Sequence, residues 1–549
     1  MGGRLITKYS VLKQPSHLLV FAFQFIVVGL IMRLDPDPHH DGILYGAAVR
    51  ISDNGVPNRD VFAQYGPLVP EIQGLWLRIF GPSLLNLRIQ ALLIFILVSV
   101  AIWNVAKLYT SRRTAHLISS TWILAIPSVL PWPNIYTTLI SIVSFFLLVN
   151  LKTREIHGNP LRIFIASSLI GVGSFGRIHL LAIFILVSLY FLIVKNLRIK
   201  VIPWVCGFLS SVVSILGILH LNGALSDFIS QCISWSFFEY ASPSINKSFI
   251  VGLFWFPVIF AFFSLIILSV QSLIRLRWGI SISYLLVTAI FLSLLLISNF
   301  NRTGDLTLRN PKVLSIDLSQ NMLNSLDYSV AFAMALAFIL GIVKVKKVET
   351  GAALGVLYSV GVMTQLYPKY DINHLWLVSP MFIIGFLVAF GQTSLFRKLS
   401  VLPLQIVLIG LCITLVSQIS YLAVQPRSNF ESSSLEGMLG PTEFARSLDL
   451  TMLELEKFAE PGSTVFQCNN GIFAGAGGKY LASSNSLVNW GPDADENKLG
   501  PQVFFCGVSD ETINEVRSLG YKVLFKVPLV YFSDKEPSGL WNVMLKRGS

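Results

Sequence analysis

Charged side chains are scarce in this sequence of 549 residues: Asp, Glu, Lys and Arg make up 13% of it, whereas 54% is hydrophobic. A soluble globular protein carries about a quarter charged residues, so the composition excludes that class. Cysteine is also rare, with five residues and no CxxC pair, which argues against a zinc site and a dense disulfide framework. The sequence therefore predicts a multi-pass integral membrane protein.

The formal net charge of +12 does not indicate a nucleic-acid partner, because the basic residues stand between apolar runs and not on one soluble face. Roughly thirteen of these runs are long enough to cross a hydrocarbon core about 30 Å thick. The predicted spans are 18–33, 89–108, 115–131, 135–151, 161–175, 179–194, 201–221, 249–270, 279–299, 328–343, 351–366, 375–392 and 401–422.

Basic clusters occupy every second connection between these spans, for example Arg112 with Arg113 and Arg397 with Lys398. The positive-inside rule places such clusters in the cytoplasm. The amino terminus is therefore predicted to be cytoplasmic, and the odd number of spans places the carboxyl terminus outside. We favour a bacterial plasma membrane over the endoplasmic reticulum.

A more polar tail follows the last span, so we divide the chain into a transmembrane module, 1–422, and an extracytoplasmic domain, 423–549. In the tail, a helical pattern over 442–459 precedes strand-like runs that start at Thr464, Val503 and Lys522, and Ser509 opens a further helix. This alternation predicts a small α/β domain. Cys468 and Cys506 each end a strand-like run, which fits either a disulfide between them or two small buried thiols.

The outer segment 34–88 carries the most informative pattern. Apolar positions at helical spacing predict one short helix after Asp41, ending at Asn54 and Gly55, and another after Gly66 and Pro67, ending at Gly81 and Pro82. Both helices are too short to span the membrane and are expected to lie at its interface.

Four motifs follow one another in this segment. They are an Asp with Tyr four positions later (Asp41, Tyr45), a Gly-x-Pro-x-x-Asp turn (Gly55 to Asp60), Tyr-Gly-Pro (Tyr65 to Pro67), and Phe-Gly-Pro-Ser before Leu-Arg-Ile (Phe80 to Ile89). Their order resembles the GT-C superfamily of membrane glycosyltransferases, in particular the polyprenyl-phosphate-sugar-dependent branch with protein mannosyltransferases and aminoarabinose transferases. The resemblance implies an all-α polytopic membrane bundle with a C-terminal extracytoplasmic α/β domain.

The resemblance also implies an inverting glycosyltransferase, which moves a monosaccharide from a polyprenyl-phosphate donor to a hydroxyl of a glycan, lipid or protein at the outer membrane face. A hydroxyl is a poor nucleophile at neutral pH, so the reaction needs a base. The position of Asp41 matches the catalytic carboxylate of that family, with Asp37 second and Asp35 third. The alternative for Asp41 is an N-cap of the helix that follows it.

A cation is expected at the donor phosphate, and Arg177, Lys369 and His374 are the phosphate-binding candidates. Their alternatives are a snorkelling interfacial Arg and ordinary helix-ending residues. Further candidates for substrate contact are Tyr45, His40, Asp60, Tyr65, His179 and Asp371.

No cofactor is firmly indicated. His39 and His40, with Asp37, have the ligand types of a divalent-ion site for zinc, manganese or magnesium; the alternative is histidines that hydrogen-bond substrate or backbone.

Two other functions fit a many-span chain. An O-antigen-type polymerase or ligase does not need the acidic two-helix first loop, and a polyprenyl-lipid flippase or transporter predicts polar breaks near the membrane midplane, whereas here the polar residues gather at one face.

Overall fold

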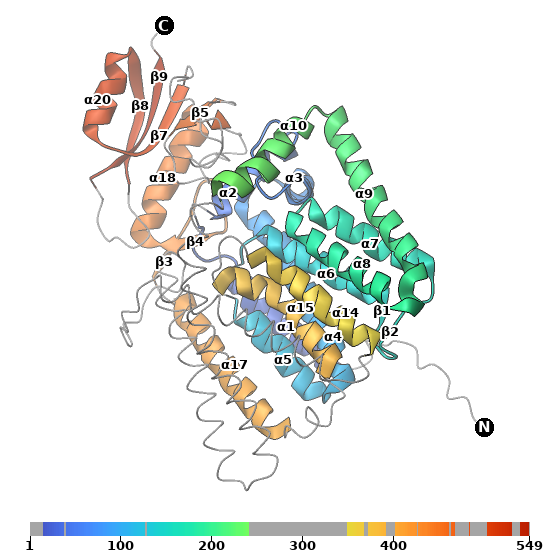
Figure 1. Ribbon diagram of the computed structural model, residues 1–549. Coiled ribbons are helices and arrows are strands. Elements are labelled where there is room, and N and C mark those ends of the chain that lie inside the picture. The colour runs from blue at the N-terminus through green and yellow to red at the C-terminus, as the bar shows by residue number, and fades with distance from the viewer. Residues whose placement is uncertain are drawn as a thin grey trace, which may run out of the picture.

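The computed structural model describes eleven stretches of the chain, and Figure 1 shows their arrangement. These are residues 15–37, 40–126, 129–240, 349–366, 372–390, 401–424, 426–460, 463–466, 482–483, 502–529 and 539–547.

Most of the described chain is a bundle of apolar helices. They are α1 (Pro15–Ile31), α4 (Leu84–Tyr109), α5 (Arg112–Leu124), α6 (Pro133–Leu148), α7 (Pro160–Ser174), α8 (Leu181–Ile193), α9 (Val201–Leu221), α14 (Thr350–Met363), α15 (Ile372–Phe390) and α17 (Val401–Val424). A helix lies at each of ten predicted spans. The other three, 249–270, 279–299 and 328–343, lie outside the described residues, so the total of thirteen stays a prediction.

Two of the described helices are long and apolar enough to cross a membrane by themselves: α4, and the continuous helix Lys195–Leu221, in which the 3-10 turn η3 (Lys195–Lys200) leads into α9. The outward side of α9 is apolar, with Val213 66% and Leu221 85% exposed. Water would penalise such a surface, whereas lipid would not. This helix face therefore agrees with the membrane class that the composition predicts.

Glycine allows the bundle helices to approach closely. A Cβ atom on Gly207 of α9 would lie 2.2 Å from the Phe164 carbonyl oxygen of α7, and one on Gly385 of α15 would lie 2.4 Å from the Gly355 oxygen of α14. Small residues at these crossings bring the backbones into direct contact, which is how helices associate where water supplies no hydrophobic driving force.

The first outer segment folds as predicted into two short helices, α2 (His40–Ser52) and α3 (Leu68–Phe80). Between them, Gly66 has a φ of +112°, and a Cβ there would lie 2.2 Å from the Phe175 oxygen, so only glycine fits. The π-helical segment η4 (Ile229–Tyr240), which follows α10 (Leu225–Phe228), holds the same loop. Gln231 Oε1 accepts from Asn58 Nδ2 at 2.9 Å and from the Ala63 amide at 3.1 Å.

An α/β unit at the carboxyl end lies at one end of the bundle (Figure 1). It begins with the hairpin β3 (Arg427–Asn429) and β4 (Leu439–Pro441) and helix α18 (Thr442–Phe458). A sheet in the order β6-β5-β7-β9-β8 follows, made of β5 (Thr464–Phe466), β6 (Ala482–Ser483), β7 (Gln502–Val508), β8 (Tyr521–Pro528) and β9 (Trp541–Arg547). Helix α20 (Asp510–Ser518) connects β7 to β8, and the Ser509 hydroxyl caps it, as predicted.

The described cysteines differ in their bonding state between the α/β unit and the helices. Cys506 in β7 is disulfide-bonded, and Cys468, for which a disulfide with Cys506 is one of the two alternatives, lies outside the described residues. Cys206, Cys232 and Cys412, by contrast, are free thiols.

Candidate functional site

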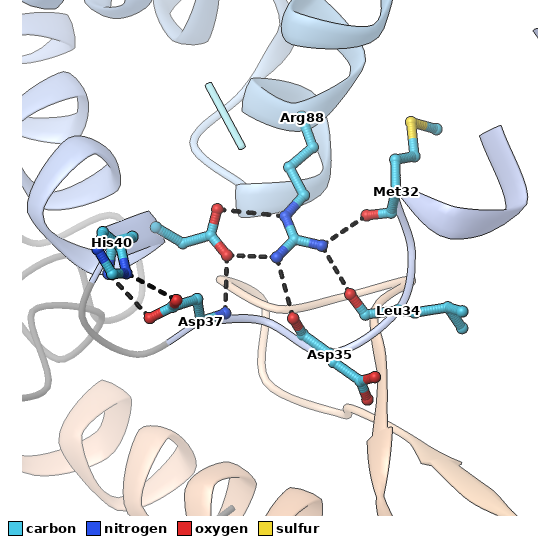
Figure 2. Close-up of polar contacts among 7 residues, drawn as sticks. Met32, Leu34, Asp35, Asp37, His40 and Arg88 are labelled. Atoms are coloured by element: carbon cyan, nitrogen blue, oxygen red, sulfur yellow. Dashed lines mark hydrogen bonds and ion pairs between the residues drawn. The ribbon is translucent and has the colours of Figure 1, made fainter. Parts of the chain in front are cut away.

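The carboxylate of Asp41 is fully buried at the start of α2 and is paired with Arg88 of α4. Figure 2 labels Arg88 and the residues that surround this pair. Arg88 Nε donates to Asp41 Oδ1 at 3.2 Å, and Arg88 Nη2 donates to Oδ2. The Asp37 amide also donates to Oδ2, at 2.7 Å. Burial raises the pKa of the Asp41 carboxyl above its usual range, and the Arg88 guanidinium opposes that shift. Both oxygens of Asp41 therefore already have donors.

Arg88 also joins α4 to the chain that leaves α1. Its Nη1 donates to the carbonyl oxygens of Met32 at 2.9 Å and Leu34 at 2.7 Å, and its Nη2 donates to that of Asp35 at 3.0 Å. A guanidinium is a rigid fork of donors, so one side chain fixes three backbone positions and one carboxylate together.

Asp37, not Asp41, caps helix α2. Its Oδ1 accepts from the His40 amide at 2.9 Å, three residues along the chain, which is the usual N-cap geometry. The other oxygen, Oδ2, lies 2.8 Å from Nδ1 of the His40 ring. The Asp37 side chain is 8% exposed and the His40 side chain 38%. The pair thus has a buried carboxylate and an accessible imidazole.

Trp132 brings four of the predicted site residues together. Its ring centroid lies 5.2 Å from that of His40, 5.6 Å from that of Tyr65 and 6.1 Å from that of His374, and its Nε1 donates to His374 Nε2 at 3.3 Å. The Arg177 guanidinium lies 4.2 Å from the Tyr65 ring centroid. We call His40, Tyr65, Trp132, Arg177 and His374 the Trp132 cluster.

Asn134 positions the cation of this cluster. Arg177 is 4% exposed, and its Nε donates to Asn134 Oδ1 at 2.9 Å, with Nη2 donating to the same oxygen. Asn134 lies in the first turn of α6, directly after the Pro131-Trp132-Pro133 turn. The Asn134 amide and the Trp132 indole therefore come from the start of the same helix. Their contacts fix the position of Arg177 relative to His374.

Four other predicted residues are placed elsewhere or lie outside the described residues. Tyr45 is fully buried, and its hydroxyl donates to the Pro82 carbonyl at 2.7 Å. Asp60 accepts from the Val56 amide at 2.8 Å and from Arg59, and the bond from Arg59 lowers the pKa of the Asp60 carboxyl. The two candidates Lys369 and Asp371 lie outside the described residues. Tyr45 and Asp60 therefore shape the loop around the cluster.

His179 is half-buried two residues after Arg177, and its carbonyl accepts from Thr364 Oγ1 at 3.2 Å. His39, the other histidine of the metal alternative, lies outside the described residues. Within the part of the chain that the structure describes, no three His, Cys, Asp or Glu side chains come together as a metal site. The two-histidine metal site stays a prediction.

Sequence reasoning did not single out Arg88, Trp132 or Arg427 as parts of the site. Arg88 had a usable signal, since it is an ionisable residue at the start of a predicted span, where burial without a partner is costly. Trp132 stood in a short turn from which only Asn134 drew attention. Arg427 lies 392 residues from its partner, Asp35, and no local pattern indicates such a contact.

Comparison with protein-family models finds no match, and comparison with curated protein sequences finds none either. Among solved structures, ArnT from Cupriavidus metallidurans bound to undecaprenyl phosphate is 13% identical, with a TM-score of 0.46, over 97% of this chain and 98% of that one. The apo ArnT gives 11% and 0.45 over the same shares. AglB from Archaeoglobus fulgidus, in complex with an inhibitory peptide and a dolichol-phosphate, gives 13% and 0.48 over 97% and 74%.

These identities and scores are low, so the function proposed below rests on the residues of the site. AglB is an archaeal oligosaccharyltransferase, and ArnT has been solved both in the apo state and with undecaprenyl phosphate.

Proposed function

We propose that this chain is an integral-membrane inverting glycosyltransferase, which moves a monosaccharide from a polyprenyl phosphate to a hydroxyl acceptor at the outer membrane face. One observation carries the proposal. The Trp132 cluster joins an imidazole that is paired with a carboxylate to a guanidinium, and aromatic rings lie between them. These are the groups that glycosyl transfer from a lipid phosphate requires: a proton acceptor, an anion-binding cation and a surface for a sugar ring.

The Asp37–His40 pair supplies the base. With Asp37 as the partner of Nδ1, the imidazole carries its proton on Nδ1 and offers Nε2 as the acceptor. The oxygen of the acceptor hydroxyl attacks the anomeric carbon while its proton passes to Nε2 of His40. The bond between that carbon and the phosphate oxygen breaks, and its electron pair leaves with the polyprenyl phosphate. In-line displacement inverts the anomeric centre.

Arg177 stabilises the leaving phosphate in this scheme. Its guanidinium is oriented by Asn134 and by the Tyr65 ring before any ligand binds, so little reorganisation is needed when negative charge develops. His374 lies across Trp132, where the imidazole adds a second polar group to the same space. In this scheme Asp41, which the sequence predicted as the base, is a positioning residue that anchors the loop carrying Asp37 and His40.

The proposed activity can be assayed without knowing the acceptor. Purified protein in lipid nanodiscs is incubated with a panel of polyprenyl-phosphate monosaccharides, and release of polyprenyl phosphate is followed with water as the acceptor. We expect slow release from one class of sugar donor and the opposite anomeric configuration in the freed sugar. Retained configuration, or no release and no binding of any donor in the panel, contradicts the proposal.

Arg177→Gln is expected to weaken binding of undecaprenyl phosphate by about 10- to 100-fold, because a charged hydrogen-bonding partner of a phosphate contributes about 1.5–3 kcal/mol. Glutamine keeps a donor for Asn134 Oδ1, so the fold around Tyr65 should remain. Binding is measured by native mass spectrometry or scintillation proximity with the labelled lipid. The matched control is Arg162→Gln, which removes an exposed Arg at the start of α7. Equal affinity for both variants excludes Arg177 from the phosphate site.

A further inference from the structure

The hairpin that begins the α/β unit lies against the loop that carries the catalytic candidates. We call residues 426–441, which include β3 and β4, the arm. The Asp35 amide donates to the Leu439 carbonyl at 2.6 Å, and the Leu439 amide donates to the Arg33 carbonyl at 2.7 Å. Arg33 Nε donates to the Gly437 carbonyl at 2.8 Å. The arm thus pairs with the chain between α1 and α2 through main-chain contacts.

The same arm also touches the start of α4, the helix of Arg88. The Leu84 amide donates to the Ser434 carbonyl at 2.9 Å. Gly437 has a φ of +79°, and a Cβ there would lie 2.7 Å from Leu85 Cδ2. The arm therefore lies over the two segments that Arg88 joins.

Asp35 is the central residue of this contact. Arg427 Nη2 donates to its Oδ2 at 2.8 Å, with the Asp35 and Arg427 side chains 0% and 6% exposed. Asp35 has a φ of +48°, which a residue with a Cβ rarely adopts, so the surrounding contacts must hold its backbone in that conformation. The same residue's carbonyl accepts from Arg88 Nη2. Its side chain is fixed by the arm and its backbone by Arg88.

A short series of contacts leads from there to the proposed base. Arg427 binds Asp35, Arg88 binds both the Asp35 carbonyl and Asp41, and Asp41 accepts the Asp37 amide. Figure 2 shows the part of this series that runs from Asp35 through Arg88 to Asp37 and His40. Every member except the exposed imidazole is buried, and ion pairs in such surroundings have well-defined geometry because alternative partners are absent.

We infer that Arg427 is a positioning residue: through Asp35 and Arg88 the outer α/β unit holds the Asp37–His40 pair in place, so that transfer depends on the arm being seated on the first outer segment. The part of this inference that concerns transfer rests on the proposed function, whereas the mechanical coupling does not.

Hydrogen exchange of the full-length protein tests the coupling independently of activity. In Arg427→Gln the amides of Asp35 and Asp37 are expected to exchange at least tenfold faster than in the wild type. The matched control is Arg517→Gln on the exposed side of α20, with exchange at both amides within twofold of the wild type. The double variant Arg427→Gln/Asp35→Asn leaves no charge buried without a partner and should recover most of the protection. Unchanged exchange at both amides in Arg427→Gln overturns the inference.

Kinetic measurements test the part of the inference that concerns sugar transfer. With rates normalised to the folded fraction, Arg427→Gln is expected to lower kcat at least tenfold with the donor KM within threefold, because the Arg177 side of the site is untouched. Arg427→Lys keeps the positive charge and should restore part of the kcat that Arg427→Gln loses. The same variant replaces Arg427→Gln in the kinetic test if the Gln protein fails to fold. A unit that only stabilised the fold would leave the normalised kcat unchanged, and that result overturns the positioning role. If the wild type transfers no sugar, the proposed function fails while the exchange result still decides the coupling.

Discussion

Asp37→Asn is expected to lower kcat by about 100- to 10,000-fold while leaving thermal unfolding close to that of the wild type. The substitution removes the negative charge that holds the His40 ring with its proton on Nδ1. Asparagine is as good an N-cap as aspartate, so the bond from the His40 amide is kept and α2 should start at the same residue. The measurement is release of polyprenyl phosphate at saturating donor, together with the apparent Tm.

Asp53→Asn is the matched control, because Asp53 is exposed just after α2 ends and carries the same charge. That variant should retain wild-type kcat. A fully active Asp37→Asn protein would remove the Asp37–His40 pair from the reaction, and the proton acceptor would then be the carboxylate that the sequence resemblance places first, Asp41. A companion variant, His40→Gln, should show a loss of the same size, since the two side chains act as one unit.

Local patterns in the sequence sufficed to place the helices. Apolar runs found each bundle helix within the described residues, and spacing found α2 and α3, because both signals depend only on neighbouring residues. The α/β unit shows where such signals end. Strand β9 inserts between β7 and β8 and pairs antiparallel with both, although it comes last in the chain. Its position depends on pairing partners, which no local pattern specifies.

The candidate site shows the same limit at the level of single residues. The sequence pointed to Asp41 as a base or a helix cap. In the structure the cap is Asp37, and Asp41 faces Arg88, which is 47 residues away. Both carboxylates are buried, and what separates them is their partners: Asp37 contacts the His40 amide and ring, whereas Asp41 contacts Arg88. The partner of each aspartate depends on how α4 packs against the loop. Only long-range contacts determine that packing.

That geometry also changes what the resemblance implies for Asp41. A base must lie within hydrogen-bond reach of the hydroxyl that it deprotonates. Asp41 has no exposed surface, and its oxygens accept three hydrogen bonds, whereas His40 is exposed and lies beside the aromatic rings. The two aspartates thus divide the work. In the proposed mechanism, Asp41 fixes the loop through Arg88, and Asp37 orients the imidazole that would take the proton.

Asp41→Asn is accordingly expected to reduce stability by about 3–5 kcal/mol, the usual cost of breaking a buried ion pair from one side. The variant leaves the Arg88 guanidinium, itself fully buried, without its counter-charge. Arg88→Met should cost at least as much, because it also removes the donor to the carbonyl oxygens of Met32, Leu34 and Asp35. A thermal-shift assay in one detergent, supported by the yield of monodisperse protein, measures both effects.

The solvent-accessible pair of Arg59 and Asp60 in the same segment, with side chains 44% and 21% exposed, provides the control for this stability test. Asp60→Asn breaks an Arg–Asp contact of the same chemistry, yet such surface pairs contribute about 0–1 kcal/mol, so its Tm should barely move. The decisive contrast is between stability and rate. If Asp41→Asn unfolds at the wild-type temperature and still loses all transfer, Asp41 acts on the acceptor hydroxyl itself and the Arg88 contact must open during the reaction. A large loss of Tm, with kcat per folded molecule reduced less than in Asp37→Asn, assigns Asp41 to the framework that holds the base.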